Sequence, residues 1–95
     1  MAKSILQNEK KCFLCGGSGG YWGLDVHHVF FGSLRSTSEK YGLTVFLCHD
    51  TCHLNGVHKN AEVNRNLQAY AQNKAIDHYG WSVEDFRKIF HKSYI

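Results

Sequence analysis

Four cysteines in two closely spaced pairs are the residues of this chain with the clearest chemistry. Cys12 and Cys15 form a C-x2-C pair, and Cys48 and Cys52 form a C-x3-C pair further along the chain. Two such pairs on separate turns can enclose a tetrahedral zinc ion, each supplying two thiolates. In a reducing compartment, four cysteines favour metal binding over disulfides. The spacing therefore predicts a structural Zn²⁺ site at Cys12, Cys15, Cys48 and Cys52.

Two alternatives to the four-cysteine site stay open at this point. In the first, His49 or His53 replaces one thiolate, because both lie beside the second cysteine pair. In the second, the four cysteines are buried and hold no metal. The four-thiolate site is preferred because it uses both pairs fully, and paired spacings of this kind are typical of zinc sites.

Seven histidines are the second unusual feature of a chain of 95 residues. His27 and His28 are adjacent in an apolar run, His53 directly follows the last cysteine, and His58 comes five residues later. A neutral imidazole can bind a divalent cation, and one with a pKa near neutrality can take a proton from an attacking water. If the fold brings these four side chains together, they could hydrolyse a phosphodiester. The alternative is that one histidine of the adjacent pair is a core residue and the other a surface residue.

The pattern of apolar and polar residues predicts two short strands before two helices. We expect strands at Leu24–Phe31 and Thr44–Leu47, because both runs are rich in residues that fit a pleated surface. The polar connection at 33–41 is expected to be a loop with one helical turn at 38–40. Residues 48–60 read as irregular, and residues 1–10 are polar enough to form a frayed or weakly helical arm.

The second half of the sequence predicts a helical scaffold. Ala61–Tyr79 shows three- and four-residue apolar spacing, and Gly80 can end this helix in the left-handed conformation. Ser82 opens a last helix, with Asp85 as its capping-box partner. Apolar stripes of this kind are usually buried. We therefore expect the following residues to face the core: Val63, Leu67, Tyr70, Ala71, Ala75, His78 and Tyr79 in the first helix, and Val83, Phe86, Ile89 and Phe90 in the second.

Length and charge limit the classes of protein to consider. A chain of 95 residues suits one small domain, and a formal net charge of +3 permits a nucleic-acid partner without requiring one. No run of residues is long and apolar enough to span a membrane, and the first eleven residues lack the apolar core of a signal peptide. We therefore expect a cytoplasmic protein with no membrane partner.

The order of these motifs resembles that of the HNH endonucleases, also called ββα-metal or His-Me finger nucleases. The matching pieces are Asp25–Val29 on the first strand, Leu43–Leu47 as the second strand, and His53 directly after a cysteine pair. Within the family, the stretches HHVFFGS, SEKYGL, LCHDTCH and GVHKN are most similar to small phage or prophage proteins related to the RecA-dependent recombination-enhancement nuclease. The resemblance implies an α+β fold and a single domain over 1–95. That domain would have a zinc-stapled HNH-like core at 12–60 and helices at 61–95.

The resemblance also implies a role for each of the four histidines. His27 and His53 would bind the catalytic ion, and His28 would be the general base that activates water. His58 would be a third ligand or a phosphate contact. The ion would be a single Mg²⁺, Mn²⁺ or Zn²⁺, since imidazole ligands tolerate softer ions than carboxylates do.

One position departs from the family pattern. Many HNH enzymes carry an asparagine or histidine near the start of the second strand, which orients the general base, but this chain has Gly42, Leu43 and Thr44 there. A backbone carbonyl of Leu43 or Thr44 could hold His28 instead, and whether it does is left open by the sequence. Asp25 is expected to orient a neighbouring histidine or to cap a backbone group, not to bind the ion.

The resemblance implies a function and a partner. The function is hydrolysis of DNA phosphodiester bonds by a phage- or prophage-associated endonuclease in recombination or DNA processing, with a recombinase as a further partner. One alternative is a zinc-stabilised nucleic-acid-binding module without catalysis, and another is a virion or host-interaction protein that uses zinc only as a staple. Positive side chains would contact phosphates without reading sequence, or else are solvated surface charges. The candidates are Arg35, Lys40, Lys59 and Arg65.

Overall fold

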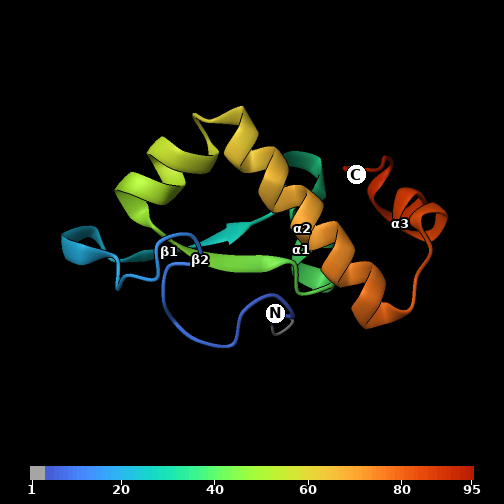
Figure 1. Ribbon diagram of the computed structural model, residues 1–95, viewed down its shortest axis with the longest axis horizontal. Coiled ribbons are helices and arrows are strands. Elements are labelled where there is room, and N and C mark those ends of the chain that lie inside the picture. The colour runs from blue at the N-terminus through green and yellow to red at the C-terminus, as the bar shows by residue number, and fades with distance from the viewer. Residues whose placement is uncertain (1–3) are drawn as a thin grey trace.

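A two-stranded antiparallel sheet forms the centre of the protein in the computed structural model (Figure 1). The structure describes residues 4–95, except for the side chains of Trp22, Thr51, Leu54 and Asn55. Strand β1 (Leu24–His28) pairs with β2 (Thr44–Cys48), so that Leu24 lies opposite Cys48 and His28 opposite Thr44. A short 3-10 turn, η1 (Gly20–Trp22), precedes β1. The expected α+β class is confirmed, with two strands and three α-helices in the described part of the chain.

Strand β1 ends three residues earlier than the sequence predicts. The backbone of Phe30 does not continue the ladder, because the buried Ser38 side chain satisfies both of its polar groups. The Phe30 N–H donates to Ser38 Oγ at 3.0 Å, and Ser38 Oγ donates to the Phe30 carbonyl at 2.6 Å. The chain then turns at Gly32, whose φ of +68° favours glycine.

The connection between the strands is mostly helical, whereas the sequence predicted a loop with one turn. It contains a 3-10 turn, η2 (Gly32–Leu34), followed directly by α1 (Arg35–Lys40). Leu43 N–H donates to the Ser38 carbonyl at 2.8 Å, which returns the chain to β2. Helix α1 is therefore fixed at the end of β1 by hydrogen bonds that join residues far apart in this connection.

The N-terminal segment runs along the other edge of β2, although the sequence predicted a frayed arm. Ser4 Oγ donates to the Thr44 carbonyl at 2.6 Å, and Ile5 N–H donates to the Gly42 carbonyl at 2.9 Å. Gln7 Oε1 then accepts from the Phe46 N–H at 2.8 Å. These contacts satisfy backbone groups of β2, and of Gly42 just before it, that β1 does not reach, so the segment protects an otherwise open strand edge.

The chain after β2 is helical. Residues 48–60 were expected to be irregular, but His49–Val57 form a wound segment with π-helical character, η3. Helix α2 (Ala61–Tyr79) and helix α3 (Val83–Phe90) follow, as the sequence predicts. Gly80 ends α2 in the left-handed conformation with φ of 69°, and the expected capping box of Ser82 and Asp85 is present at α3. No helix in the described residues combines the length and the apolar character needed to cross a bilayer.

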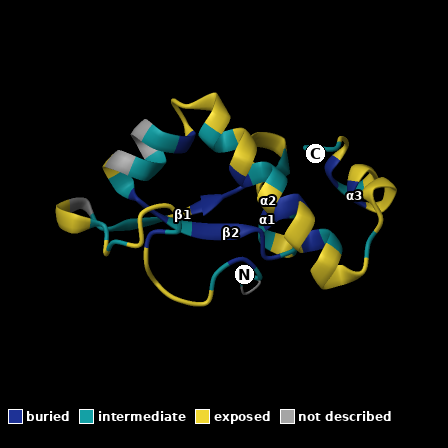
Figure 2. Cartoon of the chain, viewed as in Figure 1, coloured by how far each residue is buried: buried dark blue, intermediate teal, exposed yellow. Residues whose placement is uncertain are grey.

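The core lies between the sheet, α2 and α3 (Figure 2). Phe30 is at its centre, with ring centroids 4.8 Å from Phe90 and 5.5 Å from Phe86. The predicted stripes are only partly buried. Leu67, Ala71, Ala75, Phe86 and Phe90 are buried, and Val63 and Ile89 are half-buried, but Tyr70, His78, Tyr79 and Val83 are exposed. The buried polar residue Gln72 takes a place that the apolar pattern did not predict, where its amide bonds Ser93 and Tyr94.

Replacing Ser38 should test the device that ends β1. Ser38→Ala leaves the buried N–H and carbonyl of Phe30 without their partner, so we expect the free energy of unfolding to fall by about 1–3 kcal/mol. The exposed Ser36, in the same helix, is the matched control, and Ser36→Ala should change stability much less. Denaturant unfolding with zinc held in excess would measure both variants. Equal effects would show that the Ser38 hydrogen bonds contribute little.

Candidate metal centre and active site

The four cysteines converge at the end of β2. Their sulfur atoms all lie within 4.8 Å of one another, and Cys15 Sγ is 3.4 Å from Cys48 Sγ. Tight backbone hydrogen bonds shape the first pair into a knuckle: the Cys12 N–H donates to the Gly17 carbonyl, and the Gly16 N–H donates to the Cys12 carbonyl, both at 2.8 Å. Four sulfurs this close can surround one ion at zinc–sulfur distances of about 2.3 Å. The cluster could therefore hold a metal such as structural zinc.

The environment of Cys12 favours the thiolate form that a metal needs. Burial alone would raise the pKa of Cys12, but hydrogen bonds to its sulfur outweigh burial and lower the pKa to about 6. They come mainly from the backbone N–H groups of Cys15 and Cys48. A thiolate already populated at neutral pH loses less free energy to deprotonation when a metal binds.

Three histidines form a second candidate metal cluster. Ring nitrogens of His27, His53 and His58 all lie within 4.8 Å of one another, and His53 Nε2 is 3.0 Å from His58 Nε2. His27 Nε2 is buried and has no hydrogen-bond partner among the described residues. An unpartnered buried nitrogen costs free energy unless a ligand satisfies it. With metal–imidazole distances of about 2.0–2.1 Å, this donor set fits one divalent cation.

The histidine cluster is electrostatically suited to a cation. Burial, followed by the neighbouring His53, His58 and His28, lowers the pKa of His27 to about 3. Burial and His53 also lower the pKa of His58. At neutral pH these two rings are therefore neutral and keep a lone pair for an ion.

Asp25 orients one of these imidazoles. Its Oδ2 accepts from His53 Nδ1 at 2.8 Å and from His49 Nδ1 at 2.7 Å. Burial would raise the pKa of Asp25, but these hydrogen bonds outweigh it and lower the pKa. With Nδ1 of His53 held as a donor, its Nε2 carries the lone pair and faces the cluster. Asp25 thus has the position expected of an orienting carboxylate, and its second partner, His49, was not anticipated.

His28 points toward a different partner. Its Nε2 is buried, has no hydrogen bond among the described residues, and lies 3.7 Å from Glu39 Oε1 of α1. Glu39 could not be predicted from the sequence, because a contact between a strand and a helix eleven residues further on leaves no local signal. The polar SEK turn was visible, but its position over His28 was not.

The backbone carbonyls considered as partners for His28 are engaged elsewhere. The Leu43 carbonyl accepts from the Val29 N–H at 3.0 Å, and the Thr44 carbonyl accepts from Ser4 Oγ at 2.6 Å. His28 Nε2 bonds neither of them. Of the groups considered from the sequence, neither carbonyl bonds this nitrogen, and the group that faces it is the side-chain carboxylate of Glu39.

All four histidines reach one pocket despite their different orientations. Its volume is about 220 Å³. His28 and His53 therefore lie on the same side of the protein. The pocket is lined by Val26, His27, His28, Phe31, Arg35, His53 and His58.

The four candidate phosphate contacts are distributed unevenly. Arg35 lines the histidine pocket itself. Lys59 is exposed directly after His58, and Lys40 is exposed with its Nζ 5.4 Å from the centroid of the Tyr41 ring. Arg65 lines a separate pocket on α2. Of these four, Arg35 lines the histidine pocket, Lys59 follows one of its histidines in the chain, and Arg65 belongs to the other pocket.

Zinc content should distinguish the four-thiolate site from the site that uses a histidine. We expect Cys15→Ser to lose the tightly bound zinc and most of its stability, since structural zinc binding contributes to folding. His49→Ala should keep one tightly bound zinc per chain. Metal analysis after dialysis, together with thermal unfolding, would measure both. Zinc loss in His49→Ala would instead favour the mixed site.

A second metal should bind at the histidines with lower affinity. Titration calorimetry of the zinc-loaded protein with Mn²⁺ should show this site, and His53→Ala should remove it. Asp25→Ala should weaken it by about 10–100-fold, the usual effect of losing an orienting carboxylate. The exposed His78 on α2 is the control, and His78→Ala should bind as wild type does. Unchanged affinity in Asp25→Ala would contradict the orienting role.

No family model, no curated protein and no solved structure matches the chain. Any function must therefore be argued from its own residues.

Proposed function

We propose that this protein is a metal-dependent endonuclease that hydrolyses DNA phosphodiester bonds, as the HNH enzymes it resembles do. One observation carries the proposal. The imidazoles of His53 and His58 converge on that of His27, whose buried Nε2 has no hydrogen-bond partner in the part of the chain that the structure describes, while a fourth imidazole, His28, lines the same pocket with a different partner. A metal-assisted hydrolase needs this division between groups that hold an ion and a group that takes a proton.

The ion would be held by His27, His53 and His58. When bound there, a divalent cation such as Mg²⁺, Mn²⁺ or Zn²⁺ would stabilise the negative charge that develops on the phosphate during cleavage. Asp25 keeps the His53 ring in the orientation that directs Nε2 inward. An ion with three imidazole ligands retains open positions for water and for a phosphate oxygen.

His28 would act as the general base. Its Nε2 faces Glu39, so Nδ1 is the nitrogen left to accept a proton from the attacking water. As the ring becomes positively charged, the Glu39 carboxylate would stabilise it, as an acidic partner does for other catalytic histidines. Arg35 lines the same pocket and would contact the phosphate through its guanidinium group.

DNA is the proposed substrate because the pocket combines a cation-binding cluster with an arginine on a chain of positive net charge. Lys59, exposed beside His58, would add a second phosphate contact. The likeness of the motifs to phage and prophage nucleases extends the proposal to a role in recombination or DNA processing inside a host cell. A recombinase would be the protein partner in that role.

A zinc-stabilised nucleic-acid-binding module is the second candidate function. It is favoured by the separation between His28 Nε2 and Glu39 Oε1, which at 3.7 Å is longer than a hydrogen bond. A general base held this loosely would be inefficient. The module would bind DNA in a salt-dependent manner and would not cleave it.

Nicking of supercoiled plasmid should separate the two candidates. The wild-type protein should nick it when Mg²⁺ or Mn²⁺ is added, and His28→Ala should slow nicking by about 10²–10⁴-fold, the usual contribution of a general base. His78→Ala is the control and should nick at the wild-type rate.

The zinc content and the Mn²⁺ affinity of His28→Ala should stay unchanged. That result would show that the fold and both metal clusters survive the substitution. Full activity in His28→Ala would refute its assignment as the base. Salt-dependent DNA binding without nicking under Mg²⁺, Mn²⁺ or Zn²⁺ would establish the binding module instead.

A further inference from the structure

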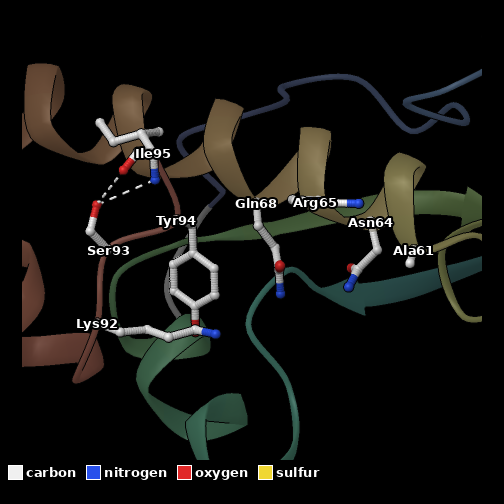
Figure 3. Close-up of a pocket in the computed structure, with 8 residues that line it drawn as sticks. All are labelled: Ala61, Asn64, Arg65, Gln68, Lys92, Ser93, Tyr94 and Ile95. Carbon is white, nitrogen blue, oxygen red and sulfur yellow. Dashed lines mark hydrogen bonds between the residues drawn. The ribbon is translucent and has the colours of Figure 1, made fainter.

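A second pocket lies between the first two turns of α2 and the residues that follow α3 (Figure 3). Its volume is about 400 Å³, within the range of small-molecule sites. None of its lining residues belongs to the cysteine or histidine clusters. The groups proposed to bind the ion and to take the proton lie outside this pocket.

Two carboxamides from α2 point into the pocket. Asn64 and Gln68 are one helical turn apart, and their side chains descend on the same side of α2 in Figure 3. Asn64 Oδ1 is buried without a hydrogen-bond partner in the part of the chain that the structure describes, so its acceptor capacity is unused, and a small rotation of the side chain would turn it to a ligand. Gln68 Nε2 lies 3.5 Å from the Val29 carbonyl, at the limit of a hydrogen bond. Side-chain amides offer a donor and an acceptor together, the combination that recognises the edge of a nucleobase.

The charge of the pocket is positive. Arg65 and Lys92 both line it and are exposed, and none of the described lining residues is Asp or Glu. Tyr94 forms an aromatic wall, held by the buried Phe30 with a ring-centroid distance of 4.7 Å. Lys92 Nζ lies 4.9 Å from the centroid of the Tyr94 ring. The pocket therefore offers cations for a phosphate and amides for a polar edge, beside an aromatic ring.

This pocket is adjacent to the histidine pocket along the chain and in space. His28 and Phe31 line the histidine pocket, whereas Val29 contacts Gln68 and Phe30 contacts Tyr94. The same four-residue segment, 28–31, thus separates the two pockets. A ligand in the second pocket would lie beside any phosphodiester bound at the histidines.

We propose that this pocket binds one unpaired nucleotide of the DNA strand that is cleaved at the histidine pocket. The inference rests on the proposed endonuclease function and names its substrate class. The base pairs its edge with Asn64 and Gln68 beside Tyr94, and its phosphate contacts Arg65 and Lys92. A base engaged in a duplex cannot present its pairing edge to these amides, so DNA with unpaired nucleotides at the cleavage point is the preferred substrate.

Fluorescence anisotropy of the zinc-loaded full chain, without added Mg²⁺ or Mn²⁺, tests this preference. The probes are a short fluorescein-labelled single strand and the blunt duplex of the same sequence. The wild type should bind the single strand more tightly, and the double variant Asn64→Ala/Gln68→Ala should weaken that binding by about tenfold, a typical effect of losing contacts to a base edge. Its binding to the duplex should not change. The exposed Asn73 on α2 is the control, and Asn73→Ala should change neither affinity.

A charge reversal on the surface gives a test that does not touch a half-buried residue. Lys92→Glu should weaken single-strand binding more than Lys74→Glu does, because Lys74 is exposed on α2 away from the pocket-lining residues. Equal affinity of the wild type for both probes, or equal weakening of both by the double variant, would overturn the proposal.

Plasmid nicking separates failure of the pocket from failure of the function. Metal- and His28-dependent nicking without a single-strand preference would overturn the nucleotide pocket and leave the endonuclease standing. A single-strand preference that depends on Asn64 and Gln68, without any nicking, would support the pocket and overturn the endonuclease.

Discussion

The convergence of the two cysteine pairs is the constraint on which the rest of the protein depends. A two-stranded sheet is only marginally stable in water by itself. Here the last residue of β2, Cys48, belongs to the same cluster as Cys12 and Cys15, which come from the segment before β1. A metal bound by these thiolates would join the N-terminal segment to the end of the sheet. The chain between the two pairs, which carries both strands and α1, would then be a closed loop with fewer conformations in the unfolded state.

One carboxylate oxygen connects that constraint to the histidines. Asp25 lies opposite Leu47 in the sheet, and its Oδ2 bonds both His49, the residue after Cys48, and His53, the residue after Cys52. The orientation of His53 is therefore set by Asp25, whose same oxygen also bonds the residue next to Cys48. A disturbance at the cysteines would reach His53 through a single hydrogen-bonded side chain, without a long pathway of packed residues.

The sequence predicts features that depend on neighbouring residues and misses those that depend on distant contacts. The bounds of α2 and α3 follow from Gly80 and from the Ser82 capping box, and the cysteine cluster follows from its spacing, so local patterns suffice for them. The end of β1 depends instead on Ser38 binding the backbone of Phe30, and the position of Glu39 over His28 depends on where α1 then packs. Neither contact has a signature in strand or helix periodicity, because each depends on the return path of the connection.

The early end of β1 explains how two adjacent histidines can serve one pocket. In a strand that continued through Phe31, His27 and His28 would point to opposite faces of the sheet. The residues after His28 would keep the same alternation and would not cover both rings. The hydrogen bonds of Ser38 instead turn the chain away from the sheet after His28. Phe31 and Arg35 then line the same pocket as the two histidines. His27 keeps the strand geometry and faces His53 and His58, while His28, at the end of the ladder, faces α1. The Ser38 hydroxyl group, through its two hydrogen bonds to the Phe30 backbone, thus helps to give the two imidazoles different partners within one site.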